Sequence, residues 1–224
     1  HTINYRTYNY RFADTSPDSL YYDNHYGILG PLGVFKQDYW KELLNDFSLY
    51  QFPEAKNPQQ FFKAGIALQT LNGSFDSGRV NQNYHNLVLH GEYRNKTRNQ
   101  KWDINANGNF YMNGFNAGDY NAFVSLRSLI SRKIGYLELG FENVNRTPSF
   151  IFNTLSGFYL GSPVDFNKEN NTQLFGVIDL PRQKLKLSGR YYLINNYSYF
   201  KDFKQPEQYA TLFNVLQLSA EKQF

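Results

Sequence analysis

Cysteine is absent from the 224 residues of this chain. Its absence excludes disulfides, cysteine-ligated zinc, iron–sulfur centres and a thiol nucleophile. The chain also lacks any run of about 18 apolar residues, so no segment qualifies as a transmembrane helix. Tryptophan and methionine are scarce, with 2 and 1 residues, whereas tyrosine and phenylalanine number 19 and 20. Because Tyr and Phe favour strands and water–lipid interfaces, this composition favours a β-rich protein.

Blocks of like charge are also missing. The 23 Lys and Arg residues outnumber the 19 Asp and Glu residues, but the basic residues are scattered along the chain. Nucleic acid is therefore not expected as a partner. No phosphate-binding loop, nucleophile elbow, dinucleotide fingerprint or zinc-binding helix is present. His85 and His90 are an odd number of residues apart, so they would face opposite sides of a strand. We expect no enzyme activity, catalytic residue, metal or cofactor.

The segment 102–113 carries the clearest pattern in the chain. Its side chains alternate between an apolar and an amide-rich set, as expected of a β-strand with two different faces. The apolar set is Trp102, Ile104, Ala106, Gly108, Phe110 and Met112, and the other set is Asp103, Asn105, Asn107, Asn109, Tyr111 and Asn113. Soluble strands usually have about five or six residues, whereas a tilted membrane-spanning strand needs roughly 9–11.

Similar patterns predict about ten strands. They cover 1–12, 45–52, 61–70, 84–95, 102–113, 122–131, 134–145, 172–180, 185–195 and 211–224, with a bulge near Ser128 and a possible short helical turn at 38–44. All eight prolines fall between these strands, as sheet hydrogen bonding favours.

The predicted connections alternate in length. The longer ones are 13–44, 71–83, 114–121, 146–171 and 196–210, and the shorter ones are 53–60, 96–100, 132–133 and 181–184. Successive connections of an antiparallel sheet lie at opposite ends, so the long loops share one end and the short turns share the other. Outer-membrane barrels have this asymmetry. Both chain ends are expected on the short-turn side.

The apolar faces allow two interpretations. In a soluble β-sandwich they would point into a shared core, whereas in an outer-membrane barrel they would face lipid and the polar faces would line the lumen. Strand length, uncharged amides on the polar faces and aromatic residues near strand ends favour the barrel. These aromatic residues are Tyr93, Trp102, Phe141 and Tyr197. The sandwich, which would be a soluble carbohydrate-binding domain, remains the alternative.

Several segments resemble the putative porins of Bacteroidota outer membranes. They are 1–7 (HTINYRT), 146–150 (RTPSF), 181–200 (PRQKLKLSGRYYLINNYSYF) and 213–224 (FNVLQLSAEKQF), and the resemblance is weakest over 33–60. It implies an antiparallel transmembrane β-barrel in the bacterial outer membrane. Members of that family are longer than this chain, so the resemblance implies that the chain is an internal portion of such a protein. Residues 1–224 are therefore expected to be a single β-barrel domain or a barrel fragment. If Phe224 is the true C-terminus, the chain would be a complete small barrel.

Polar strand positions are the candidate lumen-lining residues. They are Asn105, Asn107, Asn109, Tyr111, Glu138, Glu142, Lys184, Lys186 and Arg190. Lys184, Lys186 and Arg190 would form a basic stripe that biases a pore toward anions, with Glu138 and Glu142 opposing it. Simple solvation of a polar face would explain the same residues. The loop 146–171 is the candidate constriction, and the aromatic-rich loop 21–40 is a candidate docking surface.

The expected function is passive diffusion of small hydrophilic solutes through an outer-membrane barrel. The alternative is a plugged, non-conducting barrel that serves as a structural or interaction subunit of an outer-membrane complex. The barrel portion of an energy-coupled transporter is a third possibility, although no plug domain or coupling motif is visible. The expected partners are outer-membrane lipid and either envelope proteins or further copies of the chain.

Overall fold

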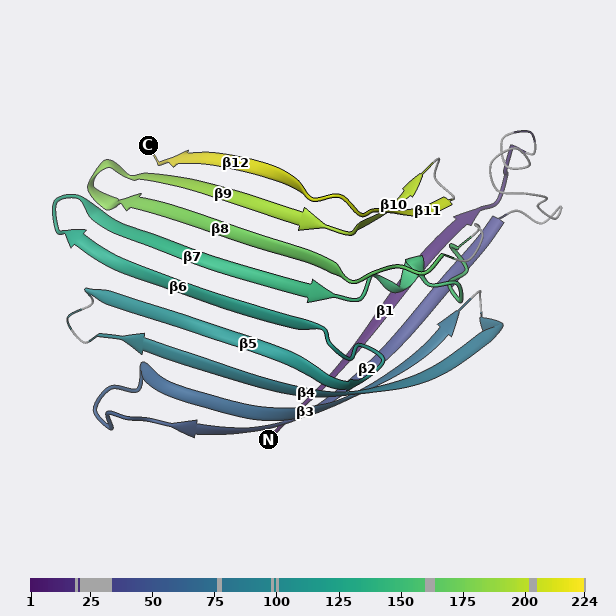
Figure 1. Cartoon of the computed structure of the whole chain (residues 1–224), viewed down its shortest axis with the longest axis horizontal. Coiled ribbons are helices and arrows are strands. Elements are labelled where there is room, and N and C mark those ends of the chain that lie inside the picture. The colour runs from purple at the N-terminus through teal and green to yellow at the C-terminus, as the bar shows by residue number, and fades with distance from the viewer. Residues whose placement is uncertain are drawn as a thin grey trace.

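The computed structural model describes residues 1–18, 20, 34–75, 78–97, 99, 101–159, 164–201 and 205–223. Ten strands form one antiparallel sheet whose order follows the chain (Figure 1). They are β1 (Thr2–Asp14), β2 (Val34–Gln51), β3 (Gln60–Phe75), β4 (Val80–Lys96), β5 (Trp102–Gly114), β6 (Tyr120–Ser131), β7 (Gly135–Arg146), β8 (Glu169–Leu180), β9 (Leu185–Asn195) and β12 (Phe213–Lys222). The prediction of an all-β antiparallel sheet with about ten strands is confirmed.

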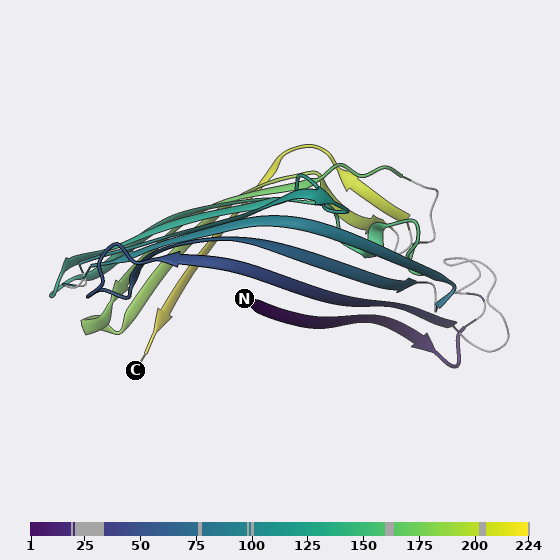
Figure 2. The ribbon, with the colours of Figure 1, turned by 90° about the horizontal axis from the view of Figure 1, so that it is seen from below.

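The sheet is open. Among the described residues, β1 pairs with β2 alone and β12 pairs with β9 alone, so two sheet edges remain and no closed barrel is formed. The sheet is arched along its strands (Figure 2). In the described part of the chain, no helix is long and apolar enough to cross a membrane. The assignment of 1–224 to a single barrel domain or a barrel fragment stays a prediction.

Residues 34–44 correct the sequence-based expectation. The sequence predicts a long loop here with a helical turn at 38–44, but β2 begins at Val34 and pairs with β1 from the Asp14–Val34 pair onward. Polar residues on both faces hide the strand pattern here, because Asp38 and Glu42 share a face with the buried Trp40. The loop assignment of 21–40 is therefore wrong for residues 34–40, and residues 21–33 lie outside the described residues. The docking role stays a prediction.

The connections follow the predicted alternation only in part. β3 extends to Phe75 and β4 begins at Val80, so the expected long loop 71–83 is a tight connection. The connections 147–168 and 196–212 are long and lie at the same end of the sheet. The predicted bulge near Ser128 corresponds to a register shift between Leu129 and Ser131.

The predicted loop 196–210 contains a hairpin. Its strands are β10 (Tyr197–Lys201) and β11 (Gln205–Tyr209), which pair with each other in a separate two-stranded sheet. Pro206 lies in β11, opposite Phe200, so the expectation that all prolines lie outside strands is wrong. Each strand of a two-stranded sheet has one unpaired side, where proline's missing N–H is tolerated. Two short 3-10 helices, η2 (Phe150–Phe152) and η3 (Pro181–Gln183), complete the described elements.

One face of the main sheet is apolar and uncovered. Register places large apolar side chains directly opposite one another from strand to strand, and most of them are exposed. One such row is Val124, Phe141, Leu174, Tyr191 and Leu216, and another is Phe47, Ile66, Leu89 and Phe110. A soluble sandwich needs a second sheet over this face, and the described residues place none there.

Candidate functional site

The opposite face of the sheet is polar and carries the sequence-predicted site residues. Register aligns two rows across β4–β9. The first is Glu92, Asn107, Phe123, Glu142, Gln173 and Tyr192, and the second is Arg94, Asn105, Ser125, Gly140, Phe175 and Arg190. Strand parity puts Asn109, Tyr111, Glu138 and Lys186 on this same face. Strand register thus places these residues on one face of the sheet, and their role as lumen-lining residues stays a prediction.

The predicted basic stripe is shorter than expected. Lys184 follows η3 in a turn, with a left-handed φ of 49°, and so does not extend the strand row. Lys186 lies directly opposite Asp179, whose Oδ2 accepts a bond of 2.8 Å from Nη2 of Arg127. Acidic side chains therefore offset part of the positive charge at this end of the face.

Glu138 lies close to the basic residues. It borders the same cavity of about 310 Å³ as Lys186 and Arg190. Glu138 is in β7 and the two basic residues are in β9, so they share one wall of the sheet with β8 between them. Within the described residues, the predicted opposition between the acidic and basic sets is thus a local mixture of charges and not a separation across a space.

The described segment 147–159 of the connection between β7 and β8 crosses the polar face. Its residue Phe150 stacks on Phe75 of β3 with ring centroids 3.9 Å apart, and it meets Trp40 of β2 edge-on at 4.4 Å. Asp38 of β2 accepts hydrogen bonds from the Ser156 hydroxyl and from the Gly157 backbone N–H, the latter at 3.0 Å. A connection between β7 and β8 therefore reaches β2 and β3, which lie beyond β4–β6 in the sheet.

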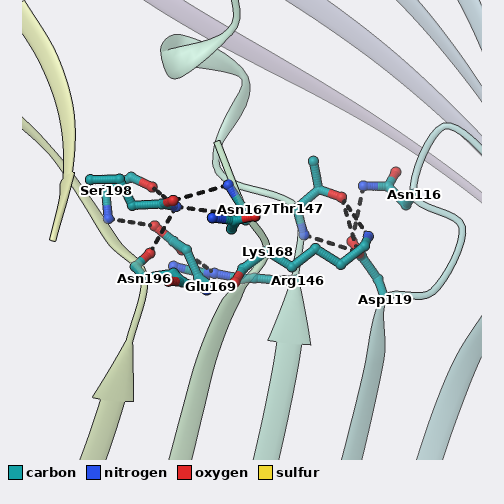
Figure 3. Close-up of polar contacts among 10 residues, drawn as sticks. Asn116, Asp119, Arg146, Thr147, Asn167, Lys168, Glu169, Asn196 and Ser198 are labelled. Atoms are coloured by element: carbon teal, nitrogen blue, oxygen red, sulfur yellow. Dashed lines mark hydrogen bonds and ion pairs between the residues drawn. The ribbon is translucent and has the colours of Figure 1, made fainter. Parts of the chain in front are cut away.

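Asp119 anchors both stems of this connection (Figure 3). Its carboxylate accepts hydrogen bonds from the backbone N–H and hydroxyl of Thr147, each at 2.9 Å, at the start of the connection. It also binds the ammonium of Lys168 at the end of the connection, and Asn116 Nδ2 donates to it at 3.1 Å. Asp119 is only 6% exposed, so these partners replace the water that its charge has lost.

Glu169 forms a second anchor beside the first (Figure 3). It accepts a bond of 2.9 Å from Arg146 Nε and one of 3.0 Å from the backbone N–H of Ser198 in β10. Gln208 of β11 in turn exchanges hydrogen bonds with the backbone of Asn167 at 2.8 and 2.9 Å. Asp119 therefore ties the connection 147–168 to the connection between β5 and β6, and Glu169 ties it to the β10–β11 hairpin.

Sequence reasoning missed Asp38, Asp119 and Glu169. No local signal marks them, because each looks like an ordinary polar residue next to or within a strand. The partner of Asp38 is 118 residues away along the chain. In the parts of the chain that the structure describes, no group of three or more His, Cys, Asp or Glu side chains could hold a metal ion.

The arrangement combines an exposed apolar face, a polar face with mixed charges and an anchored segment that crosses the polar face. A family model described as "Putative porin" matches residues 1–224. The match includes 33–60, where the resemblance of the residues is weakest. Comparison with curated proteins finds no match.

Proposed function

Because the chain belongs to the putative porin family, we propose that its sheet forms all or part of the wall of a transmembrane β-barrel in the outer membrane of a bacterium of the Bacteroidota. The exposed apolar face would contact lipid, and the polar face would line the lumen. The edges of β1 and β12 would be closed by pairing with each other, with further strands or with another copy. Lipid is thus the main partner, and nucleic acid is not one.

The barrel would let small hydrophilic solutes diffuse passively. The observation that carries this proposal is the segment 147–159, which lies over the polar face and is held by Asp38, Phe75 and Trp40. A segment anchored in this way would narrow a lumen without depending on large movements. Selection would rest mainly on size, since the mixed charges around Arg127, Asp179 and Lys186 would bias the lumen only weakly toward anions.

A plugged barrel that acts as a structural subunit is the second candidate. The tight hold on the segment favours it, since Asp38 is 1% exposed and Ser156 is 4% exposed. Such a barrel would conduct nothing and would anchor envelope partners. Neither proposal assigns an enzymatic step or a cofactor to the chain.

Conductance of the intact, detergent-extracted protein in planar lipid bilayers separates the two candidates. A porin should give discrete current steps in potassium chloride, and a variant with 150–157 replaced by a short glycine–serine linker should give larger steps. A silent native protein whose shortened variant conducts would support the plugged subunit. Silence of both would argue against a lumen of any kind.

A further inference from the structure

Two phenylalanine rings form a platform on the otherwise polar face. Phe175 of β8 lies directly opposite Gly140 of β7, and its ring covers the space that a Cβ on Gly140 would need. Phe123 of β6 lies beside it, with ring centroids 6.0 Å apart and planes inclined by 18°. Both rings are half-buried, and neither belongs to the buried core of the sheet. The Phe175 ring can thus lie flat against the sheet because Gly140 has no side chain.

Hydrogen-bonding groups surround this platform. Phe175 borders the cavity of about 310 Å³ together with Arg127, Tyr136, Glu138, Asp179, Lys186 and Arg190. The guanidinium of Arg127 stacks over the Tyr136 ring at 4.4 Å and pairs with Asp179, so part of this wall is fixed before any ligand arrives. The volume lies near the lower end of the roughly 300–1,000 Å³ of typical small-molecule sites.

We propose that the platform and this cavity form a subsite for hexopyranose sugars inside the lumen, an inference that rests on the proposed pore function. A pyranose ring has an apolar face of C–H groups and a rim of hydroxyls. The aromatic ring has a negative face that attracts such C–H groups. The carboxylates of Glu138 and Asp179 can accept hydrogen bonds from hydroxyls, and Arg190 and Lys186 can donate them.

The location of the subsite and its weak affinity suit a sugar that passes through the pore and is not retained there. Glu138, Asp179 and Lys186 of the subsite lie within a few residues of the short turns 132–134 and 181–184, whereas the segment 147–159 follows the other end of β7. A sugar that has passed the narrowing would therefore meet the subsite next. Solutes leave a pore only if each site holds them weakly. A single aromatic platform with exposed polar neighbours fits such weak binding.

The test measures interruption of the ion current by maltotriose in the intact protein reconstituted in planar bilayers. Phe175→Leu keeps apolar volume but removes the flat ring, and it should weaken maltotriose block by about two- to tenfold. Gly140→Ala should displace the ring and weaken block in the same direction. Ion conductance without sugar is recorded for each variant, and maltotriose block is expressed as the fraction of that variant's own current.

Matched controls lie on the apolar face. Phe141→Leu changes a phenylalanine that faces away from the lumen, and Gly176→Ala adds a methyl that meets only ordinary contact with Leu139 at 3.4 Å. Neither should change maltotriose block. Polyethylene glycol of similar size, which lacks a pyranose face, should affect the native protein and Phe175→Leu equally.

The outcomes separate this inference from the proposed function. A conducting protein that maltotriose does not block, or one in which Phe175→Leu behaves like Phe141→Leu, would overturn the sugar subsite alone. Block by citrate without block by maltotriose would make the cavity an anion site and would also overturn it. A silent protein would overturn the pore and the subsite together.

Discussion

Asp38 holds residues 156 and 157, at the far end of the segment that crosses the polar face, so its replacement should release that end. We consider Asp38→Leu, which is close in shape and cannot accept a hydrogen bond. The matched control is Asp38→Asn, which keeps one side-chain oxygen as an acceptor. Ser156 and Gly157 would lose the Asp38 carboxylate as hydrogen-bond acceptor in the first variant and keep a weaker acceptor in the second.

The magnitude follows from the two hydrogen bonds. Bonds to a charged group contribute about 1.5–3 kcal/mol each, and the near-complete burial of Asp38 leaves little screening by solvent. The cost of desolvating the carboxylate offsets part of this, which leaves about 3 kcal/mol for the pair. Since about 1.4 kcal/mol is a factor of ten, the docking equilibrium of residues 156–157 should shift by about 150-fold. The stacking of Phe150 on Phe75 is untouched, so η2 should stay in place.

Two assays report the release. Single-channel recordings should show a larger or noisier current for Asp38→Leu, and limited proteolysis should cut within 153–159 faster than in the native protein. Asp38→Asn should lie close to the native protein in both assays. Native conductance and native protease resistance in Asp38→Leu would refute the reasoning, because they would mean that the segment is held in place without this carboxylate.

Two further predictions concern lipid contact and pH. Phe141→Arg should destabilise the protein folded in lipid vesicles by about 2–4 kcal/mol if this residue faces the membrane centre. Glu142→Gln, on the opposite face, should change the midpoint of urea unfolding little. Equal effects of the two substitutions would argue against a lipid-facing apolar row. In the β10–β11 hairpin, the hydrogen bond from the Tyr199 hydroxyl to Glu207, with help from Lys201, lowers the pKa of the Glu207 carboxyl. The hairpin should therefore keep this stabilisation above the ordinary glutamate pKa and lose it as pH falls through the lowered value. In the Tyr199→Phe variant, NMR titration should show the Glu207 pKa moved back toward its ordinary value.

Strand parity was predictable from sequence because it depends on neighbours in the chain. Phe141 and Glu142 point to opposite faces in any strand, so the residues of the apolar and polar faces of β7 could be assigned before the fold was known. The same argument placed Asn105 and Arg190 on one face. Gly140 and Phe175 lie in the predicted strands 134–145 and 172–180, but their direct opposition depends on the register between β7 and β8 and could not be read from either segment.

Sequence patterns did not predict the strand at 34–44, where polar side chains are buried against residues far away in the chain. β2 was mistaken for a loop over 34–44 because Asp38 and Glu42 sit on the face that also buries Trp40. Local alternation fails there, since a carboxylate is stable in a buried position only when other parts of the chain bring it hydrogen bonds. For Asp38, those partners come from residues 156 and 157.

The sequence by itself determined an antiparallel sheet of about ten strands, with one apolar face and one polar face. Period-two patterning and turn residues depend only on residues close together in the chain, so they can be recognised without knowledge of the fold. Only the tertiary structure decided where the connection 147–168 lies and which acids hold it. Its position depends on Asp38, Asp119 and Glu169 losing water and gaining partners from separate connections. Such desolvated contacts exist only once the sheet has brought those segments together.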